Sequence, residues 1–208
     1  AGLFKGLTAQ YLIKTTATVS QDDVVVVQAA SGGVGQLLVQ WCKALGATVI
    51  GSTSSAQKAP CIVAAGADAV HILGDNPLTE TVIETTQGRM ANVVFDSVGR
   101  ATFEDSYACL GMIGKLVKFG AASGPPPPIK VDDLYSRGLF VTRPSVFHHI
   151  SSQDGLLERS RDVFNAIRDE MIAPKVAHTY ELEAVAEAHR ALQSRRTQGS
   201  VILTPEAQ

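Results

Sequence analysis

Cysteine is scarce in this sequence, and its few copies lie far apart. The chain of 208 residues contains three cysteines, Cys42, Cys61 and Cys109, and none of them belongs to a C-x-x-C pair. An odd number of cysteines at these separations indicates neither a structural zinc site nor a disulfide framework. We therefore expect no bound metal, and a reducing compartment such as the cytoplasm.

The sequence also lacks an excess of positive charge and a long apolar run. Its 18 Lys and Arg residues are outnumbered by 20 Asp and Glu residues, which gives a net charge of -2. This balance does not favour binding to nucleic acid or to a membrane surface, and no stretch is long enough for a transmembrane helix. A secretory signal and an initiator Met are both missing, so we expect the chain to begin inside a longer protein.

What the sequence does contain is a buried strand, a glycine-rich turn and a helix in direct succession. The valines of Val24–Val27 are typical of a strand that is buried on both faces. The following turn reads Ala30-x-Gly32-x-x-Gly35, which is the dinucleotide-binding fingerprint with Ala in the first place. In such a unit the helix N-terminus points at a pyrophosphate. A purely structural turn between strand and helix is the alternative.

Strand and helix patterns alternate along the first 150 residues. Strands are predicted at Val24–Gln28, Thr48–Gly51, Ala69–Leu73, Asn92–Asp96, Lys115–Gly120 and Leu139–Thr142. Helices are predicted at Val34–Leu45, Pro60–Ala65, Leu78–Thr86 and Ala101–Cys109, whereas His148 and His149 are expected in a loop. This alternation predicts an α/β fold, a doubly wound parallel sheet of Rossmann type with helices on both faces.

The pattern changes near residue 150. A charged amphipathic helix over Ser152–Asp169, an extended segment over His178–Leu182, a helix over Leu182–Ser194 and a closing strand over Ser200–Leu203 are expected there. We therefore predict a nucleotide-binding domain over residues 1–150. Residues 151–208 would form C-terminal helices and a return strand that pack beside it.

The residues after the second predicted strand indicate which cofactor is preferred. A fold that prefers NAD usually ends this strand with an acid that binds the ribose 2′-hydroxyl. Here Ser52, Ser54 and Lys58 follow instead, and the next carboxylate is Asp68. Hydroxyl and ammonium groups would hold a 2′-phosphate, so the sequence predicts NADP(H) and argues against a methyltransferase. Alternatively, Ser54-x-x-Gln57 is a helix capping box and Lys58 is a solvated surface residue.

Several segments together resemble a known enzyme family. They are Lys5–Leu12, Ala29–Gly35, Gln40–Ala47, Phe95–Gly99, Phe119–Gly124, Thr142–Pro144 and Ala188–Arg195. In this order they resemble the zinc-independent quinone oxidoreductases of the medium-chain dehydrogenase/reductase superfamily, the zeta-crystallin-like group. The resemblance implies hydride transfer from NADPH to a quinone, an enone or a related electrophilic carbonyl. It also implies that a GroES-like catalytic domain precedes this segment in the whole protein.

The glycine motif, the second strand and the resemblance together give a set of candidate cofactor-binding residues. They are Thr8, Ser31, Gly32, Gly33, Val34, Gly35, Ser52, Ser54, Lys58, Ser97, Gly99, Phe119, Gly120, Ser123 and Arg195. The resemblance implies that Arg195 reaches the 2′-phosphate and that Thr8 lies on the nicotinamide side. It identifies no catalytic residue. Ala121 and Leu73 depart from the family pattern, which has Asn and Tyr there, so each is expected to weaken the pocket.

Two further expectations concern partners and activity. The resemblance implies a homodimer joined through the strand over Gly138–Arg143, whose apolar residues would otherwise leave an exposed sheet edge prone to aggregation. Asp96 is expected to cap a turn rather than act as a catalytic acid. A non-catalytic nucleotide-binding module, like a crystallin or an RNA-binding relative, is the alternative to the reductase.

Overall fold

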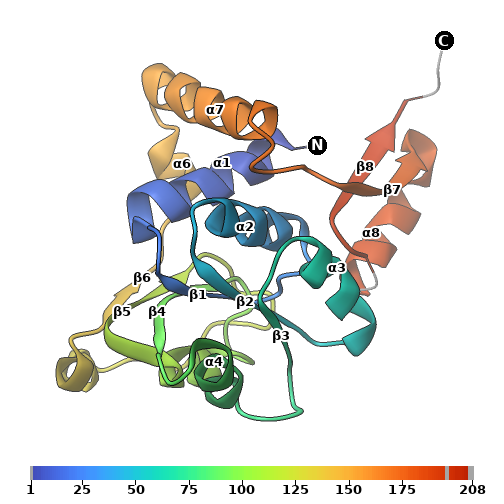
Figure 1. Cartoon of the computed structure of the whole chain (residues 1–208). Helices are drawn as coiled ribbons and strands as arrows, with labels where there is room; N and C mark the ends of the chain where they lie inside the picture. Colours follow the sequence, from blue (N-terminus) through green and yellow to red (C-terminus); the bar gives the residue numbers. More distant parts are fainter. Residues whose placement is uncertain (1, 195–196, 206–208) are drawn as a thin grey trace.

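A parallel sheet of six strands forms the centre of the molecule, in the order β3-β2-β1-β4-β5-β6 (Figure 1). The structure, a computed structural model, describes residues 2–194 and 197–205. The strands are β1 (Val24–Val27), β2 (Thr48–Thr53), β3 (Ala69–Ile72), β4 (Ala91–Asp96), β5 (Leu110–Lys118) and β6 (Phe140–Thr142). Every neighbouring pair is parallel. This strand order is that of the doubly wound dinucleotide-binding sheet, so the predicted fold class is confirmed.

The four valines of β1 explain why this strand lies at the centre of the sheet. All four are fully buried, and β1 pairs with β2 on one side and β4 on the other. Successive side chains on a strand point to opposite faces. Accordingly, Val25 and Val27 belong to the hydrophobic cluster on one face of the sheet, and Val24 and Val26 belong to the cluster on the other.

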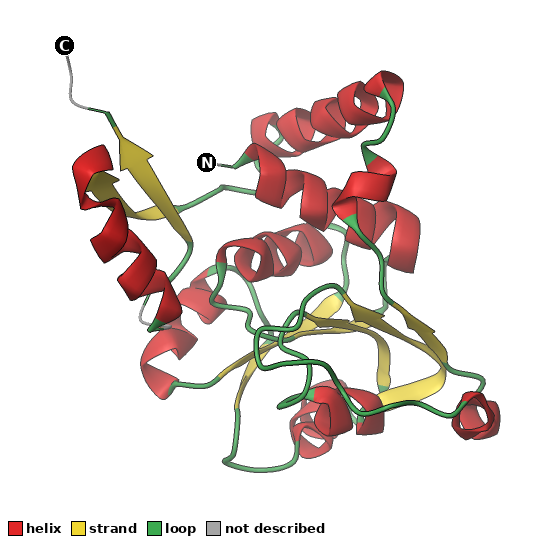
Figure 2. Ribbon diagram, turned by 180° about the vertical axis from the view of Figure 1, so that it is seen from behind, coloured by secondary structure: helices red, strands yellow, loops and turns green. Residues whose placement is uncertain are grey.

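Helices cover both faces of the sheet (Figure 2). The helices α1 (Leu3–Tyr11) and α2 (Gly33–Ala44) contribute to one cluster, and α4 (Leu78–Thr86) and α5 (Phe103–Ala108) to the other. Ile62 of the short helix α3 (Ala59–Ala64) packs on the α1 and α2 side. The helix α1 continues as a π-helix over Leu12–Ala17. In the described part of the chain, no helix is both long and apolar enough to cross a membrane.

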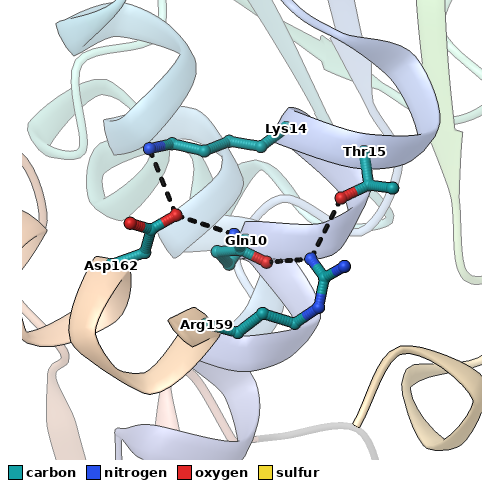
Figure 3. A network of polar contacts seen from close by, with 5 residues as sticks. All are labelled: Gln10, Lys14, Thr15, Arg159 and Asp162. Atoms are coloured by element: carbon teal, nitrogen blue, oxygen red, sulfur yellow. Dashed lines mark hydrogen bonds and ion pairs between the residues drawn. The ribbon is translucent and has the colours of Figure 1, made fainter. Parts of the chain in front are cut away.

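A polar network fixes the helix α7 (Gln153–Arg168) against α1 and its extension (Figure 3). Oδ2 of Asp162 accepts a hydrogen bond from Nε2 of Gln10 at 2.8 Å and lies 3.3 Å from Nζ of Lys14. Nη1 of Arg159 donates to Oε1 of Gln10 at 2.7 Å and to Oγ1 of Thr15 at 3.0 Å. The two helices are therefore tied together by polar groups as well as by apolar packing.

The helix α6 (Val146–His149) corrects one prediction, because it places His148 and His149 in a short helix rather than a loop. The imidazole of His149 stacks on the ring of Tyr11 with the centroids 4.4 Å apart. This contact with α1 gives the segment a fixed packing position that its local sequence does not indicate.

The last described segment forms a small unit beside the main sheet. The strands β7 (Val176–Glu181) and β8 (Ser200–Thr204) pair in parallel, and α8 (Val185–Gln193) connects them. Figures 1 and 2 agree that this unit stands to one side of the main body. The elements predicted after residue 150 are present, while the division of the chain into two domains at that residue stays a prediction.

Candidate functional site

The glycine-rich turn joins the carboxyl end of β1 to the start of α2. Gly32 is the N-cap residue of α2, with an extended backbone (φ −76°, ψ 168°). The backbone N–H of Gln36 donates to the carbonyl of Gly32. The N–H groups of Gly33, Val34 and Gly35 therefore precede the first hydrogen bond of the helix, and such groups at a helix N-terminus form a site for an anion.

The turn needs a glycine at position 35 because helix and strand approach each other closely there. A Cβ atom on Gly35 would lie 2.5 Å from the carbonyl oxygen of Ala29 and 2.8 Å from Cα of Ala30. Both of these atoms belong to the backbone, so neither can move aside as a flexible side chain would. This close approach is the role of the last glycine in a dinucleotide-binding turn.

A cavity of about 210 Å³ opens beside the turn. It is lined by Ala29, Ser31, Gly32, Thr53, Ser54, Lys58, Leu73, Val98, Ala122 and Thr197. Ala29, Thr53 and Val98 come from the carboxyl ends of β1, β2 and β4, or just after them. Ligands of open α/β sheets bind at this edge, where the strand order reverses between β1 and β4. The structure thus brings together the glycine turn and the end of β2, which lie about 20 residues apart in the sequence.

One positively charged side chain lines the cavity. It is Lys58, the one charged residue among the described residues of the lining, and the exposed Ser54 lines the cavity as well. Lys58 is the last residue of a short 3₁₀ turn over Ala56–Lys58. The N-cap residue of this turn is Ser55, and the Ser55 side chain makes no capping hydrogen bond. The turn thus begins one residue later than the capping box at Ser54 requires. A cation and a hydroxyl without a carboxylate suit a phosphate group.

The side chain of Ser52 does not line the cavity, unlike those of Thr53 and Ser54. Its side chain is fully buried, and its hydroxyl donates a hydrogen bond to Oε1 of Gln28. Nε2 of Gln28 in turn donates to Oγ of Ser106 at 2.9 Å, and that hydroxyl donates to Oδ2 of Asp96 at 3.0 Å. Ser52 therefore belongs to a buried network behind the cavity wall rather than to the wall itself.

Asp96 anchors this network and the loop that follows β4. Its Oδ1 accepts hydrogen bonds from the backbone N–H groups of Val98 at 2.7 Å and Gly99 at 2.9 Å. Its Oδ2 also accepts from Oγ1 of Thr102 at 2.8 Å. The carboxylate is buried and shared among loop donors, so the expectation that Asp96 caps a turn is confirmed.

The loops after β4 and β5 interlock beside the cavity. Oγ of Ser123 donates to the carbonyl of Val98 at 2.8 Å, and a Cβ on Gly120 would lie 2.5 Å from the carbonyl oxygen of Ser97. Gly99 has a positive φ of 92°, and a Cβ there would lie 2.4 Å from the carbonyl oxygen of Gly124. These predicted residues hold the loops that bring Val98 and Ala122 to the cavity.

Among the residues that the structure describes, the side chains of the remaining predicted ones do not line the cavity. Val34 and Phe119 are partly buried against the core cluster that contains α2. Oγ1 of Thr8 donates to the carbonyl of Phe4 within α1, at 3.0 Å. Arg195 lies outside the described residues. Leu73, where the family pattern has Tyr, lines the cavity as an apolar residue.

Sequence reasoning missed several lining residues. Thr53, Val98 and Ala122 are immediate neighbours of predicted residues, so the motifs located them to within one position. Thr197 has no comparable local signal. Over residues 2–194 and 197–205, there is no group of three or more His, Cys, Asp or Glu that could hold a metal ion. The expectation of no bound metal stays a prediction.

Comparison with known proteins identifies the family to which the chain is similar. The model of the family described as zinc-binding dehydrogenase matches residues 33–165. A quinone oxidoreductase from Salmonella typhimurium is 42% identical over 208 residues, covering 99% of this chain and 64% of that protein. A 2-haloacrylate reductase from a Burkholderia species is 40% identical over 210 residues, covering 100% and 63% respectively. The chain thus spans less than two thirds of the length of these relatives.

A solved structure gives the same relationship in three dimensions. The crystal structure of Escherichia coli quinone oxidoreductase complexed with NADPH superposes with a TM-score of 0.90 at 41% identity. The match covers 97% of this chain and 64% of that one. The resemblance predicted from the sequence motifs is confirmed by these comparisons.

Proposed function

The chain belongs to the family of zinc-binding dehydrogenases, and on this premise we propose that it is the cofactor-binding part of an NADPH-dependent reductase. The whole enzyme would transfer a hydride to a quinone, an enone or a related electrophilic carbonyl. The observation that supports this most directly is the cavity of about 210 Å³, which both the glycine turn and Lys58 line. The names of the relatives, quinone oxidoreductase and 2-haloacrylate reductase, point to the same kind of electron acceptor.

Each part of the site would hold one part of the dinucleotide. The N–H groups of Gly33, Val34 and Gly35 would bind the diphosphate, because they lie at the positive end of α2. Ser54 and Lys58 would bind the 2′-phosphate, because they bring a hydroxyl group and a cation to the same cavity. When bound, the nicotinamide supplies the hydride, while the protein binds and orients it.

The remaining predicted residues have supporting roles in this proposal. Ser31 and Gly32 would lie beside the diphosphate, whereas Ser97, Gly99, Phe119, Gly120 and Ser123 would shape the loops beside the nicotinamide. Ser52 acts from behind the wall through Gln28. Thr8 and Arg195 are retained as candidates on the strength of the family resemblance.

Calorimetric titration with NADPH and NADH tests the proposal. We expect NADPH to bind more tightly than NADH, and Lys58→Ala to weaken NADPH binding by roughly tenfold or more with little change for NADH. Lys130→Ala, which removes an exposed lysine outside the cavity, is the matched control. Equal and weak binding of both cofactors by the unaltered chain would contradict the 2′-phosphate site.

A second experiment separates the reductase from a non-catalytic nucleotide-binding module. Both would bind NADPH through the same turn, so binding alone does not discriminate between them. The full-length protein should oxidise NADPH when a quinone is added. Tight NADPH binding without quinone-dependent oxidation would instead support the non-catalytic module.

The proposal includes a homodimer joined at the β6 edge of the sheet. In the described sheet β6 is one of the two edge strands, and it presents Phe140, which is 56% exposed and lies opposite Lys115 of β5. An apolar edge strand left open would invite pairing with other chains. Sedimentation of the full-length protein should give a dimeric mass, and Phe140→Lys should shift it toward the monomer.

The free thiols of Cys42, Cys61 and Cys109 suit a cytoplasmic location.

A further inference from the structure

The segment that leads into β8 runs across the glycine turn. The backbone N–H of Gly199 donates to the carbonyl oxygen of Ser31 at 3.1 Å, and Gly199 pairs with Gly32 in an isolated parallel bridge. The N–H of Ser200 donates to the carbonyl of Lys175 at 3.0 Å. Thr197, in the same segment, lines the cavity. Residues from opposite ends of the chain therefore build one wall of the site.

Lys5 of α1 holds this crossing in place. Its Nζ donates a hydrogen bond to Oγ of the buried Ser200 at 2.9 Å. A Cβ on Gly33 would lie 2.6 Å from that Nζ and 3.0 Å from the carbonyl oxygen of Gly199. The Lys5 side chain therefore lies in contact with both the first residue of α2 and the start of β8. Burial lowers the pKa of Lys5 below its ordinary value, because desolvation disfavours the charged ammonium.

We propose that Lys5 and Ser200 are positioning residues, which hold Thr197–Ser200 against the glycine turn and thereby set the affinity for the dinucleotide. Neither side chain lines the cavity. They act through Gly199, whose bond to Ser31 fixes the carbonyl side of the turn, and through the close contact with Gly33. The inference rests on the proposed function, because it assigns these residues to the diphosphate end of the same site.

Lys5 and Ser200, which we call the clamp, should affect cofactor binding differently from Lys58. The clamp lies at the turn that would bind the diphosphate, which NADPH and NADH share. Loss of the clamp should therefore weaken both cofactors by the same factor. Loss of Lys58 should weaken NADPH alone. This contrast distinguishes the two ends of the site.

Four variants of the chain test the clamp. Lys5→Met keeps the length of the side chain but removes the donor and the charge, and Ser200→Ala removes the acceptor. Lys5→Arg keeps a positively charged donor and should retain most of the affinity. Lys14→Met is the control, because Lys14 belongs to the same helical segment but pairs with Asp162, away from the turn. Calorimetric titration with NADPH and NADH, urea unfolding and hydrogen exchange are measured on each.

We expect Lys5→Met and Ser200→Ala to weaken both cofactors equally, by roughly tenfold, since each removes a hydrogen bond that involves a charged group. Without cofactor, both variants should exchange faster at the amides of Gly199 and Ser200, while the strands of the main sheet exchange as before. Lys14→Met should change neither measurement.

Three results would overturn the inference. Unchanged affinities in Lys5→Met and Ser200→Ala, when the unaltered chain binds NADPH, would overturn the clamp and leave the proposed function intact. Faster exchange throughout the sheet would show that the variants merely unfold. Binding of neither cofactor by the unaltered chain would overturn the proposed function, and with it the assignment of the clamp to a dinucleotide site.

Discussion

The hydroxyl of Ser52 in β2 donates a hydrogen bond to the side-chain oxygen of Gln28, which follows β1. Both side chains are fully buried. Ser52→Ala would leave that amide oxygen without its donor, which costs about 1–3 kcal/mol of the free energy of unfolding. Urea unfolding measures the loss. Ser54→Ala, at the exposed cavity wall, should change stability by less than about 0.5 kcal/mol. Equal unfolding midpoints for the two variants would contradict this assignment.

The contact between Gly35 and Ala29 gives a second prediction. Because a Cβ on Gly35 would lie 2.5 Å from the carbonyl oxygen of Ala29, Gly35→Ala must push helix and strand apart. We expect a loss of about 1–3 kcal/mol in unfolding free energy, together with weaker binding of both NADPH and NADH. Thermal unfolding and calorimetric titration measure the two effects.

A glycine outside the turn is the control for this substitution. A Cβ on Gly111 of β5 would meet Cβ of Met90 at 3.1 Å, a milder contact with no backbone atom closer than 3.6 Å. Gly111→Ala should therefore lose less stability than Gly35→Ala and leave cofactor binding unchanged. If the two variants behaved alike, close approach at the turn would not be the reason for Gly35.

Ser52 and Ser54 also show which features of the site a sequence pattern does not predict. The polar run from Ser52 to Ser54 correctly predicts that hydroxyl groups lie at the end of β2. Successive residues on a strand point to opposite faces, and a run that is polar throughout does not indicate which face is which. Thr53 and Ser54 line the cavity, whereas Ser52 turns into the buried network. The location was predictable, and the direction of each side chain was not.

Long-range packing accounts for the other omissions. The valines of β1 and the glycines after it are local signals, so the sheet and the turn are predicted well, and the predicted bounds of α4 equal the observed ones. The helix α1 was not predicted, although its residues Leu7 and Tyr11 are buried against the body. Thr197 reaches the cavity only because the chain returns from α8, and no local pattern encodes that return.

His71 predicts a dependence of stability on pH. The side chain is buried on β3, with Nδ1 3.2 Å from Oγ1 of Thr81, and its Nε2 has no hydrogen-bond partner among the described residues. Burial lowers the pKa of His71 below its ordinary value of 6.5, and Asp105 and Asp75 only partly oppose this shift. The unfolded chain then binds more protons than the folded chain just below pH 6.5, so stability falls as the pH falls through that window.

Substitution of His71 tests the sign of this effect. His71→Phe cannot take up a proton, so its unfolding free energy should fall less between about pH 7 and about pH 5 than that of the unaltered chain. Urea unfolding at several pH values measures the slope. Burial also lowers the pKa of His149, so His149→Gln is the comparison that separates the two contributions. A steeper fall in His71→Phe would reverse the sign and refute the argument.

The crossing of α1 and α7 allows a test by double substitution. A Cβ on Gly6 would lie 2.5 Å from Cγ1 of the buried Val163. Gly6→Ala should therefore cost about 1–3 kcal/mol through overpacking, and Val163→Ala roughly 2 kcal/mol through the cavity that it leaves. In the double variant the methyl group introduced at position 6 fills that cavity, because the two groups would occupy the same space. Urea unfolding should then show a combined loss that is smaller than the sum of the two single losses by at least about 1 kcal/mol.

The control combines Gly6→Ala with Val82→Ala. Val82 is buried on α4, on the other face of the sheet, so the losses of these two substitutions should be additive. Additive losses for Gly6 and Val163 would mean that the helices separate rather than interlock at this point.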